Sequence, residues 1–438
     1  MTSLPANRAK TLKEAYRACD VKPLTGENIA RYYVDLSAVG NTEAIEGVST
    51  DLDIHEPGEF NTILFTGHRG CGKSTELKRI QPQCENKYRV IDREFDLERD
   101  VNDAEYTDLY LLLSKKVADD LTELRLKFDP KLLDSFASWF KEDVTQKTEA
   151  TVQSSVSIEA EARAGAEIPL ISKLAAKLIG QIRGYSQQKK VIRETLGRNL
   201  SRLQTDINLL LKDAFDKLKR QDPDRYQTGF LVIVDNLDRI PPSVGNHLFF
   251  DDAAQLQELD CTIIYTVPIS VIDSYKNVSN LFGNPNIVPM VNIYEVSRSE
   301  CDLNYNQQRV DGVTSWSEQR VDVSSAIFAD RPQLLDLVKA SGGHVRQLMQ
   351  ASRSAYRTAI TRKHSKVLAE EVTYALKQQQ FDFEKSTPGP EYYTNLPEVG
   401  IEKEITKDER GQNLLFNVSV FPFGNTTAIV GGIMSTHS

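Results

Sequence analysis

A glycine-rich segment between a β-type run and a helix-type run constrains this chain more than any other feature. Residues 61–66 read Asn-Thr-Ile-Leu-Phe-Thr, residues 67–75 read Gly-His-Arg-Gly-Cys-Gly-Lys-Ser-Thr, and residues 76–80 continue at helical spacing. A strand, a G-x-x-x-x-G-K-S loop and a helix in this order make a phosphate cradle, because backbone N–H groups and the positive end of the helix face the anion. The segment therefore predicts a P-loop.

The loop residues have distinct predicted roles. We expect Lys73 to reach the β- and γ-phosphates of ATP, and Ser74 to ligate Mg²⁺. A chance match in a glycine loop is the alternative, and the flanking strand and helix argue against it. The predicted nucleotide-binding residues are the whole segment: Gly67, His68, Arg69, Gly70, Cys71, Gly72, Lys73, Ser74 and Thr75.

An apolar run that ends in an acid supplies the second signal. Residues 230–235 read Phe-Leu-Val-Ile-Val-Asp, which is typical of a parallel strand buried on both faces. Asp235 is the second predicted Mg²⁺ ligand, directly or through water; an acid that caps the next helix is the alternative. The following residue, Asn236, cannot take a proton. Hydrolysis is therefore either absent or uses Asp238, and we favour slow hydrolysis through Asp238, provided that the local turn lets it reach the γ-phosphate.

Two further polar residues are candidates for contact with the γ-phosphate. Thr266 stands near the end of a strand predicted at 262–267, although ordinary strand-end chemistry explains it equally well. Arg346 follows Gly342-Gly343 at an abrupt helix start, from which it can fold back onto the phosphates; a surface arginine is the alternative. The predicted catalytic set is Lys73, Asp235, Asp238, Thr266 and Arg346.

The remaining segments predict an α/β sheet with a long insertion. We expect further strands at 88–95 and 287–294, and two near the end of the chain at 413–422 and 426–430. The interval 97–229 reads mainly as helix, and its details follow from two patterns.

The first pattern is a period of two at residues 151–168, which predicts an extended hairpin arm, with helix or disorder as alternatives. The second is helical spacing. Leucines recur every fourth residue from Leu170 to Ile182, which predicts one amphipathic helix. The apolar stripe from Ile192 to Leu218 predicts one long helix of coiled-coil type.

Composition narrows the class of protein. The net charge is −9 and the pI about 5.4, which argues against a protein that coats nucleic acid. The five cysteines form no CxxC pair and predict reduced thiols in a cytoplasmic protein. The first residues lack the apolar core of a secretory signal, and no window approaches the length of a membrane span.

The order of these motifs resembles the STAND branch of AAA+ ATPases, which includes NACHT and NB-ARC proteins and is related to Orc-type initiators. The resemblance is carried by the P-loop, D-N-x-D-R at 235–239, T-x-P at 266–268, G-G-H-x-R at 342–346 and the two terminal strands. It implies an α/β fold: a three-layer P-loop NTPase core with a parallel sheet, a large mainly helical insertion, a helical lid and a C-terminal winged-helix-like domain.

The implied domains are an N-terminal segment with a nucleotide-proximal loop at 1–58, a core at 59–299 with the insertion at 97–229, a lid at 300–382 and a winged-helix-like domain at 383–438. Tyr32 or Tyr33 could stack on adenine, with ordinary burial as the equal alternative. Arg239 or Arg298 could act on a neighbouring subunit as an arginine finger. The basic clusters at 189–202 and 346–366 are interpreted as solvated helix faces, with contacts to nucleic-acid phosphates as the less favoured alternative.

The resemblance also implies a function. ATP and Mg²⁺ would be the cofactors of a slow ATPase switch that forms a homo-oligomer or engages a partner, as in bacterial anti-phage defence. The chain has no evident fused nuclease, protease or TIR module, so the effector would be a separate protein. The alternative is a DNA-binding AAA+ ATPase of initiator or transposition-regulator type, which the winged helix favours and the acidic charge opposes. A small-molecule kinase is less favoured.

Overall fold

The structure is a computed structural model. It describes residues 8–36, 43–92, 101–126, 128–139, 168–182, 187–295, 304–323, 327–386, 404–423 and 427–430, and the single residues 389, 392, 396 and 399. The arm predicted at 151–168 lies outside these residues, apart from the first residue of a helix, and so does Arg298.

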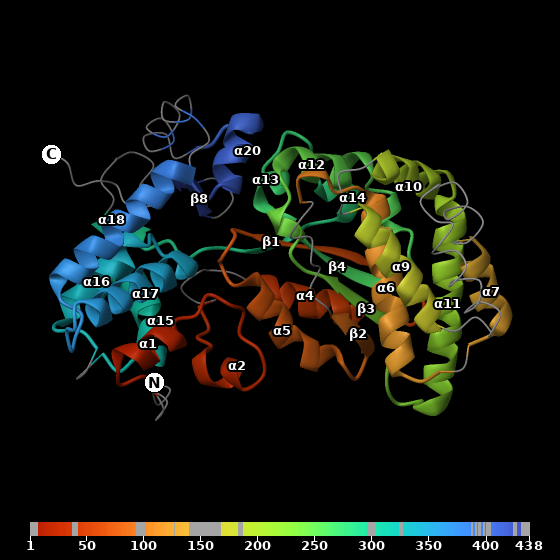
Figure 1. The fold of residues 1–438 in the computed structure, drawn as a ribbon, viewed down its shortest axis with the longest axis horizontal. Helices are drawn as coiled ribbons and strands as arrows, with labels where there is room; N and C mark the ends of the chain where they lie inside the picture. The colour runs from red at the N-terminus through yellow and green to blue at the C-terminus, as the bar shows by residue number, and fades with distance from the viewer. Residues whose placement is uncertain are drawn as a thin grey trace.

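A five-stranded parallel sheet forms the centre of the molecule (Figure 1). Its spatial order is β2-β3-β4-β1-β5. Parallel strands place their carboxyl ends at one edge, so the loops after β1 and β3 open toward the same side. The predicted α/β class is confirmed. The strands are β1 (Thr62–Gly67), β2 (Tyr88–Asp92), β3 (Gly229–Val234), β4 (Thr262–Pro268) and β5 (Asn286–Val288).

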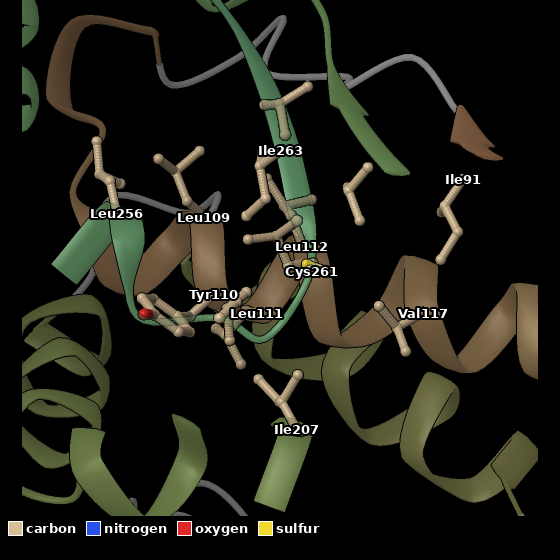
Figure 2. Close-up of a cluster of buried hydrophobic side chains, with 14 of the residues drawn as sticks. Ile91, Leu109, Tyr110, Leu111, Leu112, Val117, Ile207, Leu256, Cys261 and Ile263 are labelled. Carbon is tan, nitrogen blue, oxygen red and sulfur yellow. The ribbon is translucent and has the colours of Figure 1, made fainter. Parts of the chain in front are cut away.

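Alternate strand residues face opposite layers of helices, as the period of a strand requires. On one face, Ile63 and Phe65 of β1 pack with the helices α4 (Ala44–Ile54) and α5 (Lys73–Cys84). On the other face, Ile91 and Ile263 pack against α6 (Tyr106–Glu123), as Figure 2 shows. The sheet is therefore buried on both sides, which explains why its central strands read as unbroken apolar runs.

The insertion forms a helical layer beyond α6, at the far end of the molecule from the N-terminus (Figure 1). The helix predicted from the leucine spacing is confirmed as α9. The single long helix predicted from Ile192 to Leu218 is wrong: it is two helices, separated at Asn199, whose φ is −112° and ψ 18°. Gly197 and Asn199 are weak helix formers, and the apolar stripe continues across the break. The helices are α7 (Pro130–Trp139), α9 (Ile168–Ile182), α10 (Gln187–Arg198) and α11 (Leu200–Gln221).

Arg193 ties α10 to the segment that leads into α6. Its guanidinium lies 2.9 Å from Asp103 Oδ1 and 3.0 Å from Glu105 Oε1, and it also pairs with Asp108. The side chain is 7% exposed. Sequence reasoning placed this arginine in a basic surface cluster, whereas burial next to three carboxylates makes it part of the internal packing.

A second lobe gathers the helices that follow the sheet. It has its own apolar core, and the N-terminal helix α1 joins it through Leu12 and Ala15. Figure 1 shows α1 beside α15 and α17, although the sequence separates them by about the whole core domain. The lobe comprises α1 (Leu12–Ala18), α15 (Gln307–Arg320), α16 (Arg331–Ala340), α17 (Val345–Thr361) and α18 (Ala369–Ser386).

The strands predicted near the chain end are partly corrected. Residues 409–416 form the helix α20 (Glu409–Phe416), because Asp408 caps it by accepting from the Gly411 N–H at 3.0 Å. The strand begins only at β8 (Val420–Phe423), which pairs antiparallel with β9 (Thr427–Val430). The winged-helix-like domain stays a prediction.

The strand predicted at 287–294 is also shorter than expected. It is β5 up to Val288, and the antiparallel pair β6 (Tyr294–Glu295) and β7 (Asn304–Tyr305) follows. Within the described ranges, no helix combines the length and the apolar character that a bilayer crossing requires. The short elements are α2 (Glu27–Tyr32), α12 (Pro242–Asn246), α13 (Ile269–Ile272), α14 (Ser279–Phe282), 3₁₀ turns at Val101–Asp103, Leu237–Arg239 and Gln255–Gln257, and a π turn at His247–Asp251.

Candidate functional site

The loop after β1 has the backbone of a phosphate cradle. Gly67, Gly70 and Gly72 have φ values of 150°, 94° and 111°, a region that residues with a Cβ rarely adopt. The helix α5 begins directly afterwards at Lys73, so its positive N-terminal end faces the loop. The strand, loop and helix predicted from the sequence are confirmed here, and the loop has the form that phosphate binding requires.

Lys73 is buried and held by three oxygens. Its Nζ lies 2.8 Å from the carbonyls of Gly67 and His68 and 2.8 Å from Asp238 Oδ2, and the side chain is 4% exposed. Burial opposes the charge of this amine, but the Asp238 carboxylate outweighs burial and raises the pKa of Lys73. The lysine is therefore charged and paired with an acid of its own chain.

Asn236 creates the turn that brings Asp238 to Lys73. Its φ is 73°, a left-handed conformation that asparagine tolerates better than most residues, and a 3₁₀ turn follows. Burial would raise the pKa of Asp238, but Lys73, Arg69 and Arg239 outweigh it and the pKa is lowered. Asp238 is therefore a carboxylate, and the turn that the sequence left open does direct it to the P-loop lysine.

Asp235 and Ser74, the two predicted Mg²⁺ ligands, lie side by side. Burial raises the pKa of Asp235, while hydrogen bonds from the Ser74 hydroxyl and the Asn236 N–H act against burial. The Asn236 N–H lies 2.7 Å from Asp235 Oδ1. Carboxylate and hydroxyl oxygens are the ligands that Mg²⁺ prefers, so this pair fits the predicted ion.

Helix α17 of the second lobe contacts the P-loop directly. His344 caps α17 by accepting from the Gln347 N–H through Nδ1 at 3.1 Å, and its Nε2 lies 2.9 Å from the Arg69 carbonyl. Accepting at Nδ1 requires the tautomer with hydrogen on Nε2, which then donates to Arg69. A Cβ built on Gly70 would lie 2.7 Å from both His344 Cε1 and Arg346 Cβ, so only glycine allows this approach.

Several cations surround the single carboxylate of Asp238. Burial lowers the pKa of Arg346, and Arg69 and Arg239 act in the same direction, while Asp238 opposes them. Together with Lys73 these groups form what we call the cation cluster: Arg69, Lys73, Arg239 and Arg346. A cluster with more positive groups than negative ones is suited to a polyanion such as a triphosphate.

Two predicted site residues, Thr266 and His68, are buried and do not line the cavity described below. Thr266 is fully buried, and its hydroxyl donates to the Val234 carbonyl of β3 at 3.3 Å, so it is committed to the sheet in this structure. His68 is also buried, and burial, His344 and Lys73 lower its pKa well below the ordinary value, which keeps it neutral. The roles of both residues stay predictions.

A cavity of about 180 Å³ lies between the P-loop, the N-terminal segment and the second lobe. Tyr33 lines it, whereas the ring of Tyr32 faces Arg31 and Arg320. The P-loop residues from Arg69 to Thr75 line it together with Asp238, Arg239 and Arg346. The cavity thus unites most of the predicted site.

Sequence reasoning missed the part of this cavity that comes from distant segments. The Leu24 N–H donates to Thr75 Oγ1 at 3.1 Å, so the N-terminal segment crosses the start of α5. Arg320 lines the cavity, is 2% exposed and lies 3.5 Å from the ring centre of Trp316; burial lowers its pKa to about 10. The only available signal was the turn at 23–26, and nothing marked Trp316 or Arg320.

Comparison with known families places the P-loop in a recognised domain. Residues 44–250 match the sequence model of the KAP family P-loop domain. The match spans the P-loop, the helical insertion and the acidic turn at Asp235–Asp238, so this part of the chain is a P-loop NTPase domain. A comparison with curated proteins finds no match.

Two archaeal structures are among the similar solved folds. The Aeropyrum pernix ORC2 protein, in ADPNP–ADP complexes, aligns over 95% of this chain and 93% of its own, with 11% identity and a TM-score of 0.41. The Aeropyrum pernix ORC1 protein, in complex with DNA, aligns over 93% of this chain and 92% of its own, with 13% identity and a TM-score of 0.40.

Proposed function

We propose that this chain is an ATP-binding, slowly hydrolysing molecular switch of STAND/AAA+ type. The observation that carries the proposal is the direct contact between helix α17 and the P-loop, through His344 on the Arg69 carbonyl and Arg346 against Gly70. A lid that shares its charges with the phosphate cradle must respond when a phosphate enters or leaves. Gain or loss of the γ-phosphate would then change how the two lobes meet.

ATP binding would rearrange the cation cluster. Lys73 now pairs with Asp238 at 2.8 Å, and the γ-phosphate competes for the same ammonium. Once Lys73 turns to the phosphate, Asp238 is released to face solvent at the γ-position. Ser74 and Asp235 would hold Mg²⁺, which neutralises charge on the phosphate oxygens when bound. The nucleotide-binding residues of this proposal are those of the segment 67–75.

Hydrolysis would use Asp238 as the base. Water attacks the γ-phosphorus, the bond to the bridging oxygen breaks, and the water proton passes to the Asp238 carboxylate. Arg69 and Arg239, which stay near Asp238 after Lys73 turns to the phosphate, act to lower the pKa of Asp238 and make it a weak base. Slow turnover follows from this weakness. Thr266 and Arg346 complete the proposed catalytic set, with Arg346 stabilising charge on the γ-phosphate.

The biological setting of the switch rests on the motif resemblance. STAND-type proteins use nucleotide state to assemble or to engage a partner, and we extend this to bacterial anti-phage defence with a separate effector protein. The insertion at 97–229 is the part that differs from a minimal P-loop core, and it is therefore the proposed contact surface for a partner or a second copy.

Mass photometry tests the assembly step. The chain is measured alone, with ADP and with ATP plus Mg²⁺, alongside Lys73→Ala. We expect a defined larger species that forms only with ATP and is absent in Lys73→Ala. One unchanged mass in every condition would contradict nucleotide-dependent self-assembly. Salt-dependent DNA binding in that case would favour the initiator-type alternative.

A further inference from the structure

The helix α20 lies at the edge of the sheet that carries the P-loop. It packs on α12 and α13, which follow the carboxyl ends of β3 and β4, and Figure 1 shows it beside α13. Asn246 of α12 donates through Nδ2 to Gln412 Oε1 at 3.1 Å. Gln412 is buried, so this hydrogen bond helps to fix α20 on the domain that contains the sheet.

Phe416 is the last residue of α20, and its ring lies against the P-loop. The Arg69 guanidinium carbon is 5.6 Å from the ring centre, a distance at which an aromatic face attracts a cation. The ring is half-buried and belongs to none of the apolar clusters that the described residues form. By contrast, Leu414 of the same helix packs in a small apolar cluster with Val420. Core packing therefore does not explain the place of the Phe416 ring.

Arg69 lies between this ring and the nucleotide site. It lines the nucleotide cavity, whereas Phe416 does not. Burial would raise the pKa of Asp238, and Lys73 together with Arg69 lowers it, so the Arg69 guanidinium is close to this carboxylate. The carboxylate nevertheless pairs with Lys73, and among the described residues no acid lies within ion-pair distance of Arg69. The ring of Phe416 is thus a contact that orients the guanidinium.

We propose that Phe416 is a positioning residue, which holds the Arg69 guanidinium where the γ-phosphate of ATP arrives. This inference rests on the proposed function, which places Asp238 at the γ-position. An arginine side chain loses much rotamer freedom when it binds an anion, and the ring imposes part of this order before the nucleotide binds. Because the ring is uncharged, it orients the guanidinium without neutralising it, as a carboxylate would.

The proposal predicts an effect on nucleotide selectivity. ADP lacks the γ-phosphate, so an oriented Arg69 favours ATP over ADP, and loss of the ring reduces this preference. The helix α20 thereby takes part in distinguishing the two nucleotides, although its aromatic residue does not line the cavity. A residue that only stabilised the fold would change the affinity for both nucleotides alike.

Calorimetric titration with ATP plus Mg²⁺ and with ADP tests the proposal on the full chain. We expect Phe416→Leu to bind ATP about 3- to 10-fold more weakly, as for a lost cation–π contact, and to bind ADP within about 2-fold of wild type. Phe416→Tyr keeps the ring and should keep the ATP affinity. Phe381→Leu is the matched control, since Phe381 is 59% exposed on α18 and does not line the nucleotide cavity.

A double-mutant cycle connects the effect to Arg69. Arg69→Ala should weaken ATP binding more than ADP binding, and adding Phe416→Leu to it should change the ATP affinity by less than about 2-fold. Equal losses for ATP and ADP in Phe416→Leu would overturn the proposal. So would a loss that is the same with and without Arg69. If Phe416→Leu lowers the melting temperature, Phe416→Met replaces it under the same criteria, because methionine fills irregular space but has no ring.

The titrations also separate this proposal from the proposed function. ATP affinity that Phe416→Leu leaves unchanged, while Lys73→Ala abolishes ATP binding, would overturn the role of Phe416 alone. A wild-type chain that does not bind ATP would overturn the proposed function and the role of Phe416 with it.

Discussion

At Asn236 the backbone turns left-handed, and this one residue determines which carboxylate meets the P-loop lysine. The sequence contained Asp235, Asp238 and, after Asp235, an asparagine that cannot take a proton, but it could not show whether Asp238 reaches the site. Whether Asp238 reaches Lys73 depends on the backbone angle φ of Asn236, and a sequence alone does not give this angle. The geometry answers the question: Asp238 pairs with Lys73 at 2.8 Å.

The first prediction concerns Asp238→Asn. We expect phosphate release to fall by about 10²- to 10⁴-fold, because the variant has no base for the attacking water. ATP should bind at least as tightly as to wild type, because Lys73 loses its internal competitor. Single-turnover phosphate release and calorimetric ATP titration measure the two effects. Asp235→Asn is the matched control, which should instead weaken the dependence of binding on Mg²⁺. Wild-type turnover in Asp238→Asn would remove Asp238 from the mechanism.

The second prediction concerns pH and His344. Burial lowers the pKa of His344 from the ordinary 6.5 to about 4. Between these values the unfolded chain binds a proton that the folded chain does not, so stability is complete above about pH 6.5 and falls as the pH drops toward 4. His344→Asn keeps an acceptor for the helix cap but cannot titrate. Denaturant unfolding between pH 7 and 4 gives the free energy of unfolding as a function of pH. Its slope reports how many more protons the unfolded chain binds, and we expect this number to be smaller by up to about one in His344→Asn. Parallel slopes would contradict the assigned neutral histidine.

Among the elements, those with unbroken local patterns were predictable. The P-loop, the strand before Asp235 and the helix α9 follow from spacing that a few neighbouring residues define. The prediction of one long helix was wrong at Asn199, because an apolar stripe can continue across a break between two helices that share one core. The strand predicted from residue 413 was wrong at 413–416. These β-type residues lie in a helix, which the cap at Asp408 stabilises.

The third prediction concerns the link between α10 and α6. Arg193→Ala leaves Asp108 buried without its partner, so we expect a loss of about 3–5 kcal/mol in the free energy of unfolding. Lys190→Ala is the matched control on the same helix, since Lys190 is 82% exposed and lies 3.9 Å from Glu194. Its loss should stay below about 1 kcal/mol. Urea denaturation of both variants measures the difference, and equal losses would mean that Arg193 does not anchor the insertion.

For the whole molecule, the nucleotide cavity exists only because three distant segments meet. Residues 20–24, the P-loop and α17 come together from opposite ends of the chain, and α1 completes the core of the second lobe. Local sequence patterns do not predict contacts between segments that lie far apart in the chain. This explains why Lys73, Asp235 and Arg346 were predictable as motif residues, whereas Leu24, Trp316 and Arg320 were not.

Hydrogen–deuterium exchange shows whether ATP changes the contact between α17 and the P-loop. Peptides that cover 67–84 and 345–361 are compared without nucleotide, with ADP and with ATP plus Mg²⁺, in wild type and in Lys73→Ala. We predict that ATP changes exchange in both segments together, that ADP gives a different pattern at 345–361, and that Lys73→Ala removes both responses. Protection of the P-loop alone, with identical exchange at 345–361 in all three states, would contradict the switch.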